Sequence, residues 1–406
     1  MMLEVLEVRP AKPIRGCAIV PGSGNTAMPA MLAAALAPGM VELRGLPGLA
    51  DVRGLAEVLR YLGVRLRDTD DGLLVGERLP GPRHLPGRLS SGPRGAVYAL
   101  GLLAQDMDGR PRTIGPRLDL TPYAAALAGF GLMLRPAASG WALSGGPARP
   151  GEVGAGEFAV SALAAVLAAT LEGRTTIRRA GPEPEVDDVL TVLNQLGARA
   201  RRDGHDLVVE GPMTGARGPI DVPSDRMYAG TLAIAAAAAG GWVELEREVA
   251  GRMAGCLEAL RAFGVGLTET GSSVVVSGPP TRPARVRPGP YPEFPADLLP
   301  LLTLLAAQAP GRSVLEGAGR NPHVTGLRNM GARICVDRRC IIVRGPTRWR
   351  PARVTGAGAR ETCALYLAAR MACGTTVIAN AGALARGYGD LEAVLKRLER
   401  SGVQGE

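Results

Sequence analysis

The chain has 406 residues, with 47 Lys or Arg against 38 Asp or Glu and a formal net charge of +9. Its length allows two substantial hydrophobic cores and excludes both a mini-protein and a disordered tail. Aromatic residues make up only 3%, which argues against a base-stacking surface for nucleic acid, so small aliphatic side chains must fill the cores.

A pattern of helices and strands recurs six times along the chain at a spacing of about 60 to 70 residues, longer than the familiar solenoid repeats. Each repeat opens with an apolar helix of small residues, then has a short β-branched strand and, after a loop, an amphipathic helix that ends in Gly. We expect the opening helices within residues 27–39, 95–109, 161–173, 227–241, 295–311 and 361–374, and the strands that follow them at 40–45, 112–115, 175–180, 242–247, 313–318 and 375–380. The amphipathic helices are expected within 51–66, 120–134, 185–200, 252–267, 323–334 and 389–403.

The glycines that end the amphipathic helices stand where a helix C-terminus favours a left-handed residue. They are Gly63, Gly131, Gly197, Gly264, Gly331 and Gly402. The opening helices are apolar nearly all round and should be buried, whereas the amphipathic helices should lie outside. Three repeats around a set of buried helices make one domain. We therefore expect a first domain at 20–223 and a second formed by 1–19 and 224–406, with the ligand site in the cleft between them.

The six cysteines form no C-x-x-C pair and have no histidine at zinc-ligand spacing, so we expect reduced core residues and no metal site. The first residues, MMLEVLEVRPAKPIRG, lack the pattern of a signal peptide, and the longest apolar run, 229–241, is too short to span a bilayer. We expect a cytoplasmic protein with no membrane partner. Lys12 and Lys396 are the only lysines. The resulting excess of arginine suits binding of phosphate and carboxylate, although a GC-rich coding sequence would produce the same bias.

Several segments, in this order, resemble the UDP-N-acetylglucosamine enolpyruvyltransferases (1-carboxyvinyltransferases): PGSGNTAMPAMLAAALAPG, TIGPRLDL, PEPEVDDVLTVLNQLGA, VPSDRMYAGTLAIAAA, YPEFPADLL, NPHVTGLRNMGA and ALARGYGDLEAVLKRL. The resemblance covers nearly the whole chain. It implies an α/β fold of two inverse α/β barrels, each with three repeats, buried helices and outer sheets. It also implies transfer of the enolpyruvyl group of phosphoenolpyruvate to a sugar hydroxyl, with release of phosphate and no cofactor.

The resemblance assigns the reaction to a few charged residues. Asp297 matches the aspartate proposed as base for the acceptor hydroxyl, although an Asp before a buried helix also serves as an N-cap. Arg117, Arg360 and Arg386 match arginines that bind phosphoenolpyruvate, a compact trianion that needs several cations. An isolated arginine in so arginine-rich a chain is also typical of solvated surface.

Other matching positions concern the acceptor. Asn25 matches an asparagine that contacts the acceptor sugar and would also cap a helix that begins at Thr26. Arg94 and Arg320 match arginines near the acceptor or in the cleft. Backbone amides at Ala159, Val160 and Ser161 match a nucleotide diphosphate site at a helix N-terminus. Any buried helix start looks similar. His323, beside Arg320, is interpreted as an ordinary residue of a helix start.

Three positions depart from the family pattern. The lysine that precedes Asn25 in the family is Gly24 here, the loop cysteine or aspartate is Arg112, and a second catalytic aspartate is Gly358. Arg112 cannot donate its proton at working pH, but it could replace the positive charge lost at Gly24. Each loss costs on the order of a hundred- to a thousandfold in rate.

Three functions remain open at this point. The first is a divergent enolpyruvyltransferase that acts on a uridine nucleotide or UDP-sugar, and the second is a non-catalytic protein that binds an anionic nucleotide. The third is nucleic-acid work, suggested by the net charge of +9 and by RNA 3′-phosphate cyclases that share the repeat. The chain has no cyclase-like histidine near its C-terminus and no alternation of aromatic and basic residues, so we expect no nucleic-acid partner.

Overall fold

The computed structural model describes residues 5–90, 94–116, 118–317 and 319–401. The chain divides into two compact units. Unit 1 consists of residues 1–20 and 225–406, and unit 2 consists of residues 21–224. Each unit has its own cluster of buried hydrophobic side chains.

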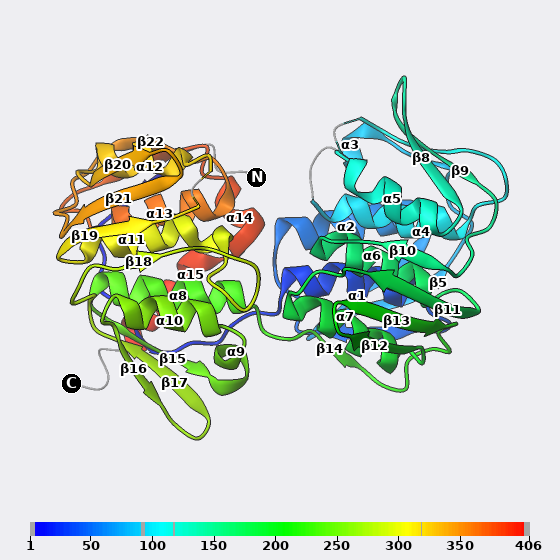
Figure 1. Cartoon of the computed structure of the whole chain (residues 1–406), viewed down its shortest axis with the longest axis horizontal. Helices are drawn as coiled ribbons and strands as arrows, with labels where there is room; N and C mark the ends of the chain where they lie inside the picture. The colour runs from blue at the N-terminus through cyan, green and yellow to red at the C-terminus, as the bar shows by residue number, and fades with distance from the viewer. Residues whose placement is uncertain (1–4, 91–93, 117, 318, 402–406) are drawn as a thin grey trace. The chain divides into compact units, whose positions relative to one another are not determined.

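Unit 2 contains three four-stranded sheets with one common design (Figure 1). In each sheet an edge strand pairs in parallel with the strand that follows an opening helix, and an antiparallel hairpin completes the sheet. The strands are β3 (Val41–Arg44), β4 (Val64–Thr69), β5 (Gly72–Arg78), β6 (His84–Leu85), β7 (Arg112–Ile114), β8 (Leu132–Ala137), β9 (Gly140–Gly145), β10 (Glu152–Gly154), β11 (Gly173–Arg178), β12 (Arg199–Asp203), β13 (Asp206–Gly211) and β14 (Ile220–Asp221). The helices are α1 (Gly24–Leu36), α2 (Ala50–Tyr61), α3 (Gly87–Ser90), η1 (Arg94–Tyr98), α4 (Ala99–Gln105), α5 (Thr121–Gly129), α6 (Phe158–Ala168) and α7 (Pro184–Gln195).

Unit 1 has two sheets of the same design and one three-stranded sheet. The N-terminal segment joins it twice, because β1 pairs with β23 and β2 pairs with β15. The strands are β1 (Val5–Val8), β2 (Arg15–Cys17), β15 (Trp242–Glu246), β16 (Gly266–Glu269), β17 (Ser273–Ser277), β18 (Arg285–Val286), β19 (Gly311–Leu315), β20 (Arg333–Asp337), β21 (Cys340–Gly345), β22 (Arg353–Thr355) and β23 (Thr376–Ala379). The helices are α8 (Arg226–Ala239), α9 (Arg247–Gly251), α10 (Ala254–Ala262), η2 (Ala296–Leu298), α11 (Leu299–Gln308), α12 (Pro322–Asn329), α13 (Ala359–Arg370), α14 (Ala383–Tyr388) and α15 (Leu391–Ser401).

The opening helices are buried because their small side chains present no polar face. In α6 every residue from Val160 to Ala168 is buried, and α8 and α11 are equally enclosed. The amphipathic helices bury one face only, as α2 and α7 show. After these helices the predicted glycines have positive φ, for example 94° at Gly63 and 90° at Gly197. The prediction is confirmed for the five described glycines, and Gly402 lies outside the described residues.

The predicted α/β class is confirmed, while the inverse-barrel arrangement stays a prediction. The prediction that all six cysteines lie in the core is wrong. All six are free thiols, but only Cys256 and Cys363 are buried. Cys17, Cys335 and Cys373 are exposed, because they lie on edge or hairpin strands and on the loop after α13. Within the described residues, no helix combines the length and apolar composition needed to cross a membrane.

Candidate functional site

Arg360, one of the predicted phosphoenolpyruvate-binding residues, is surrounded by several fixed side chains. It is the second residue of α13, which follows the N-cap Gly358, and its side chain is half-buried. Its guanidinium carbon lies 4.5 Å from the centre of the Tyr388 ring, within the range of a cation–π interaction. Its Nη1 is buried and has no hydrogen-bond acceptor among the described residues.

The surroundings of Arg360 keep its guanidinium charged. Burial by itself lowers the pKa of Arg360, but interaction with the Tyr388 hydroxyl and with the carboxylate of Asp225 raises the pKa above its ordinary value. Asp225 is the N-cap of α8, where its Oδ1 accepts hydrogen bonds from the backbone N–H groups of Met227 and Tyr228. The carboxylate is thus fixed in position by the helix that it caps.

Tyr388 packs against the guanidinium of Arg360. It is the last residue of α14 and is only 2% exposed. Its hydroxyl shares a 3.0 Å hydrogen bond with Thr231 of α8, and its ring centre lies 5.7 Å from that of Tyr228, with the planes tilted by 56°. Burial raises the pKa of the Tyr388 phenol, so the group stays neutral.

The other predicted residues of unit 1 are solvent-exposed. Arg386 lies on α14, two residues before Tyr388, and Arg320 lies in the loop before α12. Asp297 is exposed on η2, which leads directly into α11. The helices that carry or follow these residues are neighbours, because α13 packs against α11, α12 and α14, and η2 packs against α8 and α11.

A shallow depression, open to solvent, lies in unit 1 beside the segment that carries Asp297. Its lining includes Arg226, Arg252, Tyr291 and Leu298, and the guanidinium carbon of Arg226 lies 5.3 Å from the centre of the Tyr291 ring. Sequence reasoning did not single out Arg226, Asp225 or Tyr388. The sequence pattern that could have indicated Asp225 and Arg226 is an Asp–Arg pair at the start of a buried apolar helix.

In unit 2, Asn25 is exposed in the first turn of α1. The prediction that Asn25 caps a helix beginning at Thr26 is wrong. The helix begins at Gly24 and its N-cap is Ser23, whose side chain accepts from the N–H of Thr26. Ser23, two residues before Asn25, already provides the cap, so the Asn25 side chain is not committed to capping. A Cβ added to Gly24 would lie 2.6 Å from Cδ1 of Leu49.

The side chains of Val160 and Ser161 serve the fold. Val160 is a core residue of α6 and Ser161 is fully buried. The Ser161 hydroxyl donates to the carbonyl of Glu157 and accepts from the N–H of Gly181. Ala159 is half-buried in the same helical turn. A role of this segment in acceptor binding would therefore depend on backbone groups, as the resemblance implies.

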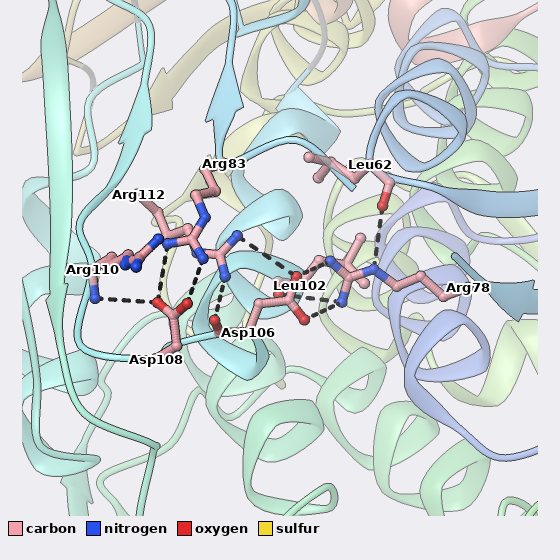
Figure 2. Close-up of polar contacts among 8 residues, drawn as sticks. All are labelled: Leu62, Arg78, Arg83, Leu102, Asp106, Asp108, Arg110 and Arg112. Carbon is pink, nitrogen blue, oxygen red and sulfur yellow. Dashed lines mark hydrogen bonds and ion pairs between the residues drawn. The ribbon is translucent and has the colours of Figure 1, made fainter. Parts of the chain in front are cut away.

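Arg112 occupies a network of ion pairs (Figure 2). It begins β7, and it is only 5% exposed. Its Nη2 donates to the backbone carbonyl of Asp106, and its Nη1 lies 4.0 Å from the Asp106 carboxylate. The same carboxylate pairs with Arg78. The Arg112 side chain thus links the start of a strand to the end of the preceding helix α4.

A second pair continues this network. Arg83 binds the carboxylate of Asp108, which also accepts from the backbone N–H of Arg110. These hydrogen bonds lower the pKa of Asp108 to about 2, and the one from Arg83 has the largest effect. The Nε of Arg112 is buried without an acceptor among the described residues.

Two predicted arginines are not placed. Arg117 lies outside the described residues, and for Arg94 the structure describes the backbone, in η1, but not the side chain. His323 is buried in α12 with its Nε2 3.2 Å from the Thr303 hydroxyl, and burial lowers its pKa to about 4. Its interpretation as an ordinary helix-start residue is consistent with these contacts.

Comparisons with known proteins give one consistent result. The model of the family described as EPSP synthase (3-phosphoshikimate 1-carboxyvinyltransferase) matches residues 8–109 and 158–395. A UDP-N-acetylglucosamine 1-carboxyvinyltransferase 2 of Streptococcus mutans is 30% identical, over 98% of both chains. A UDP-N-acetylglucosamine 1-carboxyvinyltransferase of Anaeromyxobacter dehalogenans is 33% identical, also over 98% of both chains.

Solved structures show the same fold. The enolpyruvyl transferase NikO from Streptomyces tendae has a TM-score of 0.85 and 23% identity, over 97% of both chains. An EPSP synthase from Acinetobacter baumannii has a TM-score of 0.75 and 18% identity, over 98% of both chains. At these identities the similarity concerns the fold alone.

Proposed function

The chain belongs to the EPSP synthase family, and from this premise we propose that it transfers the enolpyruvyl group of phosphoenolpyruvate to a hydroxyl of a uridine nucleotide or UDP-sugar. Phosphate is the second product. The proposal includes no cofactor. The relatives named for UDP-N-acetylglucosamine support a nucleotide-sugar acceptor.

The environment of Arg360 carries the proposal. Its guanidinium is charged, is stacked on Tyr388, and has a buried Nη1 with no protein acceptor among the described residues. An unsatisfied buried donor costs on the order of 1–3 kcal/mol. An anionic ligand would remove that cost, so the residue is suited to the carboxylate or phosphate of phosphoenolpyruvate.

The reaction requires a base for the acceptor hydroxyl and cations for the donor. In the proposed mechanism Asp297 takes the hydroxyl proton while the oxygen attacks C2 of phosphoenolpyruvate, a proton adds to C3, and loss of phosphate and of a C3 proton restores the double bond. Arg360 and Arg386 of unit 1 neutralise the donor. Exposure of Asp297 and Arg386 leaves both free to meet substrates.

The predicted acceptor contacts of unit 2 are Asn25, Arg94 and the backbone N–H of Val160, because the N–H of Ser161 already donates to the carbonyl of Glu157. Arg320 remains a predicted acceptor contact of unit 1. In the proposed reaction Arg112 contributes only a positive charge, because a guanidinium does not release its proton. Its pairing with Asp106 opposes even this role.

The test is incubation of the full chain with phosphoenolpyruvate and a panel of uridine nucleotides and UDP-sugars. Phosphate release together with a carboxyvinyl product seen by mass spectrometry is the expected result. An Arg360→Met variant should lose affinity for phosphoenolpyruvate by at least tenfold, whereas Arg312→Met, an exposed arginine on β19, should not. Absence of both products with every acceptor would refute the proposal.

A second candidate is a non-catalytic protein that binds an anionic nucleotide. It is favoured by Arg112, which stands at the family's acid position and is bound into the fold by Asp106. Gly24 and Gly358 leave two further family positions without a charged group. Thermal stabilisation by a uridine nucleotide with no turnover would support this candidate, and turnover would exclude it.

A further inference from the structure

Helix α14 meets the start of α13 at very close range. A Cβ added to Gly387 would lie 2.7 Å from the Cβ of Ala359, the residue directly before Arg360. The absence of a side chain at Gly387 therefore allows the two backbones to approach. Because Tyr388 directly follows Gly387, this contact brings the buried Tyr388 close to the first turn of α13.

Tyr388 is held on three sides. Its hydroxyl is anchored by Thr231, one side of its ring packs against Tyr228, and the ring also faces the guanidinium of Arg360. Both Thr231 and Tyr228 belong to α8, whose N-cap Asp225 supplies the negative charge that acts on Arg360. The ring is thus a rigid platform, whereas Arg360 has a long side chain with several rotatable bonds.

We propose that Tyr388 is a positioning residue for phosphoenolpyruvate binding: its ring holds the guanidinium of Arg360 in one orientation. This inference rests on the proposed function of Arg360 and adds a residue that makes no contact with the reacting atoms. The ordering of a flexible guanidinium before the ligand arrives lowers the entropy cost of binding. The aromatic face of Tyr388 carries most of this role. The hydroxyl anchors the ring to Thr231 and also interacts with Arg360.

Kinetics separate the ring from the hydroxyl. Tyr388→Leu should raise KM for phosphoenolpyruvate about 2- to 30-fold, the range of a cation–π contact, and leave KM for the acceptor unchanged. Tyr388→Phe keeps the ring and loses only the hydroxyl, so its effect on this KM should be clearly smaller than that of Tyr388→Leu. Phe263→Leu removes a fully buried ring elsewhere in unit 1 and controls for general loss of packing, with no expected change in either KM. Equal effects of Tyr388→Leu and Phe263→Leu, or of Tyr388→Leu and Tyr388→Phe, would overturn the inference.

A second readout does not depend on turnover. Phenylglyoxal labelling of Arg360 in the full chain, followed by peptide mass spectrometry, should become several-fold faster in Tyr388→Leu and change clearly less in Tyr388→Phe. Tyr388→Met, which keeps apolar volume, replaces the leucine variant if that variant does not fold. If the parent shows no turnover but labelling responds as expected, the proposed function fails and the positioning role stands. Turnover by the parent with unchanged labelling overturns the positioning role alone.

Discussion

The half-buried carboxylate of Asp106 should stabilise unit 2 more than either of its arginine partners does. Asp106 faces Arg78 and Arg112, whose side chains are only 14% and 6% exposed, while its own is 30% exposed. Asp106→Asn leaves two nearly buried cations without their countercharge. Arg112→Met leaves Asp106 paired with Arg78 and replaces a buried cation with an apolar side chain of similar length.

The two changes should therefore differ in magnitude. A unit charge at 4 Å contributes about 4 kcal/mol at an effective dielectric constant of 20. Since Asp106 retains some solvent and the backbone carbonyl still accepts from Arg112, we expect Asp106→Asn to cost about 2–4 kcal/mol. Arg112→Met should cost about 1 kcal/mol or less. The double variant should be more stable than Asp106→Asn alone, because one uncompensated cation is gone.

Urea denaturation followed by Trp141 fluorescence measures this difference within unit 2. Trp141 lies on β9, which pairs with β7, and its Nε1 donates to the carbonyl of Leu118. Trp242→Phe and Trp349→Phe in the background silence the two tryptophans of unit 1. The reasoning is refuted if Asp106→Asn is no more destabilising than Arg112→Met, or if the double variant is the least stable of the three.

Three further predictions concern the base, a buried histidine and a helix end. Asp297→Asn should lower kcat about 10²- to 10⁴-fold while calorimetric affinity for phosphoenolpyruvate stays within about threefold, and unchanged turnover would contradict the assigned role. The pKa of His323 is lowered to about 4, so the unfolded chain binds the extra proton first as pH falls below about 6.5, and stability is lost between about pH 6.5 and 4. His323→Gln should remove about 2–3 kcal/mol of that loss, seen as a smaller drop in Tm from pH 7 to 4.5; an unchanged drop argues against a buried neutral imidazole. Gly63→Ala should cost clearly more unfolding free energy than the ~1 kcal/mol expected for Gly39→Ala. Both glycines have positive φ, but only at Gly63 would the new Cβ meet a carbonyl oxygen, that of Leu79, at 2.3 Å. Equal losses of unfolding free energy would show that backbone strain alone matters.

Local patterns in the sequence were sufficient to predict the helices and strands. Small apolar residues on every side of a helix require burial wherever that helix lies, and α6 is buried accordingly. The positive φ at Gly63 and Gly197 follows from the need to end a helix in a left-handed residue. Capping was less predictable, because Ser23 and Asn25 are both good caps and stand two positions apart.

The partners of charged groups could not be read from the sequence. Arg112 and Asp106 are close in sequence, but their pairing depends on how β7 returns beside the end of α4, and Arg78 reaches the same carboxylate from 28 residues away. Arg360, Tyr388 and Thr231 meet from three different segments. An arginine in the sequence can be a ligand, a structural cation or solvated surface, and only its neighbours distinguish these roles.

The sequence by itself therefore determined the α/β class, the repeated elements and the types of charged residue available to bind an anion, because these follow from periodicity and composition over short windows. The tertiary structure alone decided which guanidinium is buried against a carboxylate and which lies against an aromatic ring. The physical reason is that desolvation and Coulomb energy depend on distances between residues far apart in the chain. Arg112 and Arg360 are the same type of residue, and only their neighbours in the fold give them different surroundings.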